Sequence, residues 1–503
     1  GGFVFFGIIL FFSFVLWGME LRWYGVAFAK ALLVTFDILF IIFSVIFMFS
    51  VLQKSSIFSN FEAGVKSLSH DRRIQAIVIA WFFVALLEGA AGFGTPAMFA
   101  APLLMHIGFP AMLAVVITLV GDSIPVTFGA VGVPITLGIT EGLPAGVLDN
   151  LEVIPRVIFN VTLIYVIVGS FVPLVISMIV SYMSSGSLRK GLELWPFALF
   201  AGFSFTLPMF VIANLLGPEF PSLLGSIIGL FIILVALKYS FLVPKNTFHF
   251  PLETGFHIKK SKVQFKLFFM SLLPYMLVVA LLALTRIPML PFGAILKCLS
   301  WEIDSLFSSS VGHVVHIFFS PAFFFLVTGL LCAWYFRQSS REVMISLRES
   351  IKKIRLPFFA LFSTLSFINI LLYSGNNATG LPSILLYLVS FTSNAKSLWP
   401  LIAPFVGLLG AFVTGSSTVS NLLFSAVQYE VASMSNFSVP LVLGLQSAGS
   451  ALGNMVAIHN IVAVLTVVGL THKDSDVLRI TIVPAILITL LVGFIGLVFQ
   501  FLM

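Results

Sequence analysis

The chain has 503 residues, of which 59% are hydrophobic and only 9% are charged, and its formal net charge is +7. A soluble domain carries about 25% charged residues, so this composition excludes an ordinary soluble protein or a chain with its own ATP-binding domain. Several apolar runs reach the roughly 20 residues that cross a bilayer as a helix. We therefore predict an all-α polytopic membrane protein, whose Lys and Arg residues mark cytoplasmic loops rather than nucleic-acid binding.

The first third of the chain contains apolar helices and then two interruptions rich in glycine and proline. Helices are predicted near 3–17 and 26–52, and a basic amphipathic segment follows them. Beyond it we predict a re-entrant hairpin at about 74–107 and a broken helix at about 109–140. Unpaired backbone groups are costly in hydrocarbon, so such breaks persist only where protein or a water-filled cavity satisfies them. Broken helices with ionisable groups therefore indicate a transport site near the bilayer midplane.

The middle of the chain is simpler. After a helix that ends near residue 182, crossings are predicted near 196–214, 222–243 and 267–285. The segment 287–320 is mixed in polarity, and we expect it to be an external amphipathic piece.

The interrupted pattern recurs near the C-terminus. A small polar break predicts a second hairpin at about 397–435, and a second break predicts a broken helix at about 438–470. Matching elements lie about 325 residues apart; Gly415, for example, follows Gly89 by 326 residues. An odd number of crossings separates the two units, so the second is expected upside down.

These elements together predict about eleven transmembrane helices, two re-entrant hairpins and an inverted structural repeat. The polar-interrupted segment 375–396 is not counted as a crossing. The predicted units are 1–182, the first repeat; 183–320, the central helices and the external segment; and 321–503, the inverted second repeat.

Three ionisable residues at the breaks are candidates for proton coupling. Glu88 and Asp122 are the acidic residues of the first unit's broken segments, and His459 lies in the second broken helix. A carboxylate or an imidazole at membrane depth can take up and release a proton. The alternatives are a structural acid that joins the hairpin to its neighbours and a core histidine with satisfied hydrogen bonds.

Small and polar residues at the breaks are candidates for binding an anion. Backbone N–H groups at the start of a helix attract a negative charge, and hydroxyl and amide side chains add donors. For any single Gly or Ser, close helix packing is the alternative. The predicted substrate-binding residues are Gly92, Gly94, Thr95, Ser123, Gly415, Ser416, Ser417, Thr418, Ser420, Asn421, Asn454 and Asn460.

No enzyme or metal motif is visible in the sequence. There is no HExxH motif and no P-loop, and Cys298 and Cys332 lack metal-type spacing. We therefore predict no catalytic residues, no metal and no cofactor. The expected partners are a small organic anion, protons and the lipid bilayer, with a homo-oligomer left open.

Several motifs carry a resemblance to a known family. They are EGAAGFGTP at 88–96, PVTFGAVGVPI at 125–135, GAFVTGSSTVSNLLF at 410–424 and DRRIQA at 71–76. With these motifs the chain resembles the L-lactate permease family of bacterial carboxylate importers. The resemblance implies uptake of L-lactate, and often glycolate, by proton symport across the bacterial inner membrane.

The chain departs from the pattern of that family at several positions. Ser417 stands where such permeases usually have Asp, Asn454 where they usually have Lys, and Asp122 where many have Asn. Ile458 and His459 stand where such permeases have Pro and Gln. A carrier for another organic anion, such as a dicarboxylate, is therefore the first alternative. A channel and an intramembrane enzyme are alternatives of other classes.

Overall fold

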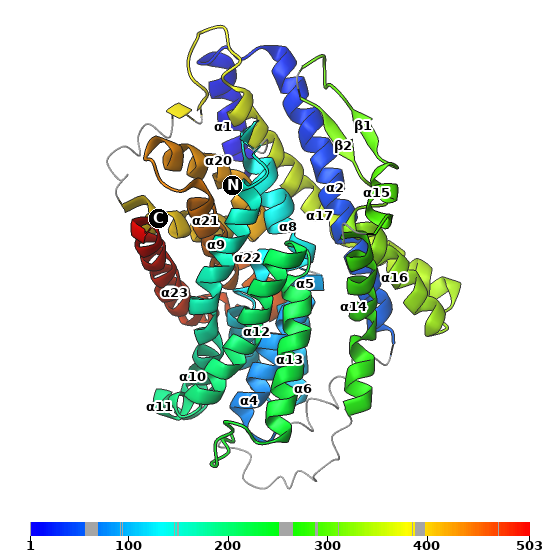
Figure 1. The fold of residues 1–503 in the computed structure, drawn as a ribbon, viewed down its shortest axis with the longest axis vertical. Coiled ribbons are helices and arrows are strands. Elements are labelled where there is room, and N and C mark those ends of the chain that lie inside the picture. The colour runs from blue at the N-terminus through cyan, green and yellow to red at the C-terminus, as the bar shows by residue number, and fades with distance from the viewer. Residues whose placement is uncertain are drawn as a thin grey trace.

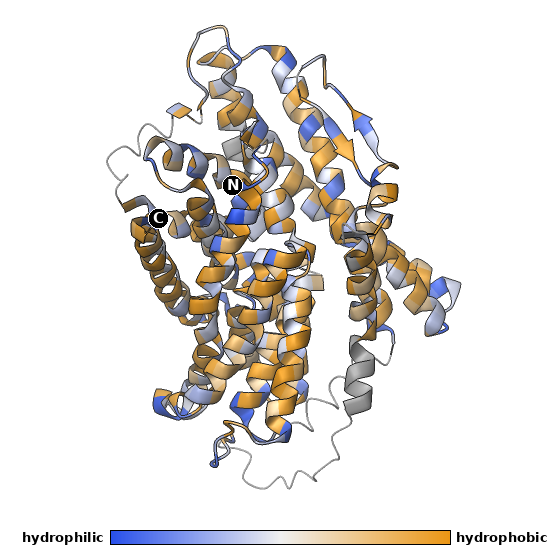
Figure 2. Cartoon of the chain, viewed as in Figure 1, coloured by the Kyte–Doolittle hydropathy of each residue, from blue (hydrophilic) through white to orange (hydrophobic). Residues whose placement is uncertain are grey.

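The computed structural model describes residues 2–55, 69–90, 92, 94–144, 146–147, 150–250, 265–286, 290–309, 311–384, 386–387, 398–470 and 472–502. Most of the predicted basic segment, from residue 56 to residue 68, and part of the segment 375–396 lie outside these residues. The protein is a helical bundle with hydrophobic residues along the middle of its helices and hydrophilic residues toward both ends (Figures 1 and 2).

The helices of the N-terminal half are α1 (Gly2–Val15), α2 (Leu21–Gln53), α4 (Arg72–Ile77), α5 (Val84–Ala90), α6 (Thr95–His106), α7 (Ala111–Gly121), α8 (Gly129–Val133), α9 (Val153–Val168), α10 (Val172–Ser185), α11 (Leu188–Leu192), α12 (Trp195–Leu216) and α13 (Pro221–Lys238). Those of the C-terminal half are α14 (Phe265–Arg286), α15 (Phe292–Lys297), α16 (Pro321–Tyr335), α17 (Ser340–Tyr373), α19 (Trp399–Thr414), α20 (Ser417–Met434), α21 (Val439–Gly453), α22 (Ile458–Val467) and α23 (Asp474–Leu502). Short π or 3-10 turns join some of them: η1 (Val78–Phe83), η2 (Pro125–Phe128), η3 (Pro134–Ile139), η4 (Thr140–Gly142), η6 (Gly169–Phe171) and η9 (Asn454–Val456).

Eight helices in the described part of the chain are long and apolar enough to cross a membrane, or nine if the bent pair 111–121 and 125–142 is one span. The two parts of that pair meet at 59°. One of the eight, Arg72–Ala90, is wholly buried inside the protein and belongs to the first hairpin. The number eleven remains a prediction, because several of the helices counted for it, such as α16, are shorter than a full span.

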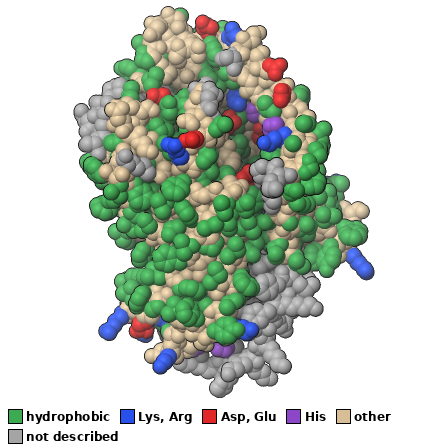
Figure 3. Space-filling view, in the orientation of Figure 1, with side chains coloured by type: hydrophobic (Ala, Val, Ile, Leu, Met, Phe, Trp, Pro, Cys, Tyr) green, Lys and Arg blue, Asp and Glu red, His purple; other side chains and the backbone are tan. Residues whose placement is uncertain are grey.

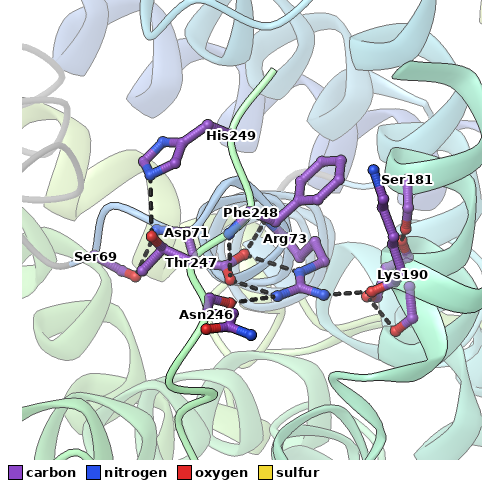
Figure 4. A network of polar contacts seen from close by, with 11 residues as sticks. Ser69, Asp71, Arg73, Ser181, Lys190, Asn246, Thr247, Phe248 and His249 are labelled. Carbon is purple, nitrogen blue, oxygen red and sulfur yellow. Dashed lines mark hydrogen bonds and ion pairs between the residues drawn. The ribbon is translucent and has the colours of Figure 1, made fainter. Parts of the chain in front are cut away.

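The first hairpin is closed at its base by buried arginines. The Arg72 guanidinium, at the start of α4, donates to the carbonyl of Ile107, at the end of α6, at 2.7 Å. Arg73 forms a buried ion pair with Asp71 at 2.7 Å, and Asp71 also accepts the Phe248 N–H at 3.1 Å. Figure 4 shows this network joining α4 to the segment around Lys190 and to residues 246–249. Both ends of the hairpin therefore lie at one side of the bundle, and its tip lies inside.

The second hairpin is held along its length by amide and hydroxyl groups. The Trp399 indole donates to Gln428 Oε1 at 2.8 Å, and Ser420 Oγ donates to the carbonyl of Gly407 at 2.8 Å. These bonds join α19 to α20 across the hairpin. Gln428 in turn donates to Gln446 Oε1 of α21 at 2.8 Å, which fixes the hairpin against the second broken helix.

Glycines allow each broken helix to touch the backbone of its own hairpin. A Cβ on Gly121, at the end of α7, would lie 1.6 Å from the carbonyl oxygen of Ala80 in η1. A Cβ on Gly453, at the end of α21, would lie 2.4 Å from the carbonyl oxygen of Leu408 in α19. Only glycine permits these approaches, and they place the next residue of each chain segment at the centre of the protein.

A peripheral unit packs beside this core, on the right in Figure 1. Helix α2 packs against α16 and α17, and α14 packs against α16. The predicted external piece contains α15 and a short antiparallel pair, β1 (Trp301–Ile303) and β2 (His313–Val315), which the all-α prediction did not include. His313 Nε2 lies 2.9 Å from Asp37 Oδ2, so this strand pair is attached to α2.

Candidate functional site

A small cavity lies where the two hairpin tips meet the two broken helices. Its volume is about 20 Å³, which is room for about one water molecule. A carboxylic acid of a few atoms would enter only if the surrounding elements moved apart. The described residues that line it are Glu88, Gly92, Val126, Gly129, Ala130, Pro134, Gly415, Ser416, Ser417, Thr418 and Asn454.

Two buried acids lie together at this centre. Glu88, on α5, is 2% exposed, and Asp122, directly after α7, is 1% exposed. The two carboxyl groups lie beside each other, and two like charges buried together cannot both be ionised without a large energetic cost. Within the described residues, no hydrogen-bond donor reaches Glu88 Oε2 or Asp122 Oδ1. The pair is therefore a candidate for holding a proton inside the protein.

A glycine makes room for these acids, and the described residues that line the cavity offer them no cation. A Cβ on Gly129 would lie 2.1 Å from Glu88 Oε1, so the carboxyl group fits only because this residue is glycine. No Lys or Arg is among the described residues that line the cavity. A charge buried without a partner is strongly unfavourable, so we expect the pair to carry at least one proton.

Amide side chains connect the acids to the second half of the chain. Asn454 Nδ2 donates to Asp122 Oδ2 at 3.3 Å, and Asn460 Nδ2 donates to Asn454 Oδ1 at 2.6 Å. Gly94, at the first tip, packs directly against Asn460, since a Cβ there would lie 2.5 Å from its Oδ1. A chain of polar side chains thus runs from Glu88 through both broken helices to Asn460, against which the first tip packs.

The second tip presents hydroxyl groups and a helix N-terminus to the cavity. Gly415 has a left-handed backbone (φ 74°), and Ser416 caps α20 by accepting the Val419 N–H at 3.3 Å. Ser417 Oγ lies 2.6 Å from Ser450 Oγ, and either hydroxyl could donate. The first N–H groups of a helix have no partner within the helix, so α20 begins as an anion-attracting end at the cavity wall.

Seven of the predicted substrate-binding residues line the cavity or join its hydrogen-bonded chain. Six belong to the second half, namely Gly415, Ser416, Ser417, Thr418, Asn454 and Asn460, and Gly92 lies opposite them. Ser123 and Ser420 are buried but bond to backbone carbonyls, of Val120 and Gly407. Asn421 donates to the carbonyl of Pro134 at 3.0 Å and so joins α20 to the first broken helix.

Two further predicted residues, His459 and Thr95, are not among the described residues that line the cavity. His459 is exposed on α22 and packs against Gly415, where a Cβ would lie 3.0 Å from the histidine Cβ. Thr95 is the first residue of α6, but its side chain is outside the described residues.

The stretch 126–134 supplies four of the lining residues, although none of its residues was predicted to belong to the site. They are Val126, Gly129, Ala130 and Pro134. The backbone after Gly129 is left-handed at Ala130 (φ 43°), Val131 (φ 61°) and Gly132 (φ 77°). The glycine and proline spacing of PVTFGAVGVPI was the available signal for an irregular backbone here.

Comparison with known proteins identifies the family. The family model for L-lactate permease matches residues 2–503. The chain belongs to the L-lactate permease family. Members of this family are transporters and not enzymes, and the chain is accordingly a multi-pass protein of a bacterial membrane.

Several curated relatives cover most of the chain. A Haemophilus influenzae relative is 32% identical over 437 residues, which are 82% of this chain and 77% of the relative. The L-lactate permease of Bacillus subtilis is 29% identical and covers 90% of this chain and 83% of its own length. The glycolate permease GlcA of Escherichia coli is 25% identical and covers 92% and 84%. The solved structure of Neisseria gonorrhoeae MtrF aligns over 92% of this chain and 81% of its own, with 12% identity and a TM-score of 0.43.

Proposed function

We propose that this chain imports a small monocarboxylate, L-lactate or glycolate, by proton symport. The observation that carries the proposal is the pair of buried acids Glu88 and Asp122 beside a hydroxyl-lined helix N-terminus, in a cavity whose described lining contains no Lys or Arg. The named activities of the Bacillus subtilis and Escherichia coli relatives support this substrate class.

The charges of substrate and proton balance in this arrangement. The substrate carboxylate would bind at the start of α20, where N–H groups and the hydroxyls of Ser417 and Thr418 can donate to it. Uptake of one further proton by the Glu88 and Asp122 pair, together with the substrate, offsets the negative charge that the anion brings. Loading both together moves no net buried charge, which makes coupled movement cheaper than movement of either alone.

A monocarboxylate fits this balance better than a dicarboxylate. One helix N-terminus and one shared proton compensate about one negative charge. A second carboxylate would need a second donor group or a cation, and the described lining residues provide no Lys or Arg. A dicarboxylate carrier is therefore the second candidate and not the first.

We further propose that the two halves are an inverted repeat with equivalent breaks. Asp122 and Asn454 follow Gly121 and Gly453, the two glycines that touch their own hairpins, and the two side chains are hydrogen-bonded. Helix α6 of the first hairpin packs against α22, and α20 of the second hairpin packs against η3 and η4. Each hairpin thus lies on the other half's broken helix, as a two-fold relation requires.

Uptake by the full chain in liposomes tests the function. The vesicles are prepared with an external pH one unit below the internal pH, and labelled L-lactate, glycolate, pyruvate and succinate are compared. We expect acid-driven accumulation of a monocarboxylate and none of succinate. A sodium gradient at equal pH is the control. Accumulation driven only by sodium, or only of succinate, would contradict the proposal.

A further inference from the structure

A large vestibule lies on the side of the protein opposite the basic loops. Its volume is about 710 Å³, and it is lined by residues of α2, of the first broken helix and of the strand pair β1 and β2. Figure 3 shows acidic, basic and histidine side chains around a hollow in the upper half of this face. Because Lys and Arg mark the cytoplasmic side, the vestibule opens to the outside.

Only a short piece of backbone separates this vestibule from the central cavity. Val131, Thr136 and Leu137 line the vestibule, whereas Ala130 and Pro134 line the central cavity. Consecutive residues of one turn therefore form the two faces of a single wall.

That wall has a strained backbone. Val131 is a β-branched residue at φ 61°, between Ala130 at φ 43° and Gly132 at φ 77°. A left-handed conformation is rare for any residue with a Cβ, and a β-branched side chain makes it a clear outlier. Such strain persists only where the surroundings enforce it, and it is found in switch regions.

The surroundings fix both ends of the wall. On one side, Gly121 is seated against the Ala80 carbonyl of η1. On the other side, Glu141 of η4 pairs with Lys30 of α2 at 3.4 Å, and Gly142 is packed against the backbone of Leu422 in α20. The turn between these two fixed ends is the part that can change conformation without unpacking a helix.

We infer that residues 129–132 are the outer gate, and that substrate passes from the vestibule to the central cavity when this left-handed turn unwinds. The strain at Val131 favours opening, and the packing around the turn favours closure. The inference rests on the proposed function only in taking the central cavity as the substrate site.

Cysteine accessibility tests the gate without measuring transport. In the full chain with Cys298→Ser and Cys332→Ala, Val126→Cys reports on the central cavity and Thr136→Cys on the vestibule. A membrane-impermeant thiol reagent is added from outside. We expect fast labelling at position 136 and slow labelling at position 126. Equal rates at the two positions, or labelling of position 126 only from the cytoplasmic side, would overturn the gate.

Two substitutions at Val131 isolate the strain. Val131→Gly and Val131→Ala both remove the branched side chain, but only glycine adopts φ 61° without steric cost. Glycine should therefore hold the gate closed, and we expect position 126 to label roughly three- to tenfold more slowly in Val131→Gly than in Val131→Ala. Equal rates in two variants that both purify as folded protein would refute the strain-driven opening. If the gate behaves as expected while no carboxylate accumulates, the proposed function fails and the gate stands.

Discussion

The break after α7 and the break after α21 differ in backbone and in how their polar groups are satisfied. The first bends the chain by 59°, whereas Val439–Val467 forms a single span. The first ends in Asp122, whose carboxyl group lies beside Glu88 and has an oxygen that no described donor reaches. The second ends in Asn454, whose amide donates to Asp122 and accepts from Asn460. One half thus holds two acids with unsatisfied oxygens, and the other holds a hydrogen-bonded amide network.

This difference indicates how the proposed symport assigns the proton and the carboxylate to different halves of the protein. An acid with an unsatisfied oxygen can change its protonation, whereas a fully bonded amide has a fixed role. The first half is therefore suited to the proton. The second half, with its helix N-terminus and hydroxyl groups, is suited to the carboxylate.

The largest expected effect comes from adding a methyl group at the first break. Gly121→Ala places a Cβ where the structure has 1.6 Å to the Ala80 carbonyl oxygen, and Gly453→Ala has 2.4 Å to the Leu408 carbonyl oxygen. Because backbone cannot move aside cheaply, we expect Gly121→Ala to yield no folded protein and Gly453→Ala to be severely destabilised. Size-exclusion profiles and thermal unfolding in detergent measure this.

The control for these variants is Gly7→Ala, where nothing lies within 4 Å of the added Cβ. It should behave as the unmodified chain. A well-folded Gly121→Ala protein would show that the two breaks do not depend on this close packing.

The next effect concerns coupling. Asp122→Asn mimics a permanently protonated acid, so the loaded carrier can still exchange substrate but cannot release the proton. A gradient of one pH unit corresponds to about tenfold accumulation for a one-proton symporter, and we expect that accumulation to vanish while substrate counterflow persists. Both are measured in the same proteoliposomes.

Ser123→Ala is the matched control, because this neighbouring buried hydroxyl bonds only to the Val120 carbonyl among the contacts described. It should retain accumulation. If Asp122→Asn also accumulates substrate, the proton lies elsewhere and the contrast between the two halves is wrong.

A smaller effect is expected at the second tip. Ser416→Ala removes the cap of α20 and costs about 1 kcal/mol, which corresponds to roughly a fivefold weaker substrate Kd if the cap orders the binding end of the helix. Ser416→Asn keeps a capping side chain and should restore binding. Substrate-induced changes in tryptophan fluorescence report the Kd, and equal losses in both variants would assign Ser416 a role other than capping.

The smallest effect is expected at His459. This side chain is exposed and packs against Gly415 through its Cβ, which alanine retains. We expect His459→Ala to change stability by less than about 0.5 kcal/mol and to leave the pH dependence of uptake unaltered. A shifted pH profile would bring the second half into proton handling and weaken the comparison.

The sequence by itself determined the membrane class, the family and the places where helices break. Hydropathy over about 20 residues is a local property, and glycine, proline and small polar residues interrupt a helix wherever they cluster. For the same reason Glu88 and Asp122 could be singled out, because an acid within an apolar run is rare.

Only the tertiary structure decided which of these residues meet. A spacing of about 325 residues pairs Gly453 with Gly129, but Gly121 is the glycine that touches its hairpin as Gly453 does. The contact between Asp122 and Asn454, the position of His459 outside the cavity and the left-handed turn at Val131 all depend on packing between distant segments. Such contacts are set by the shapes of facing helices, which no local pattern of residues encodes.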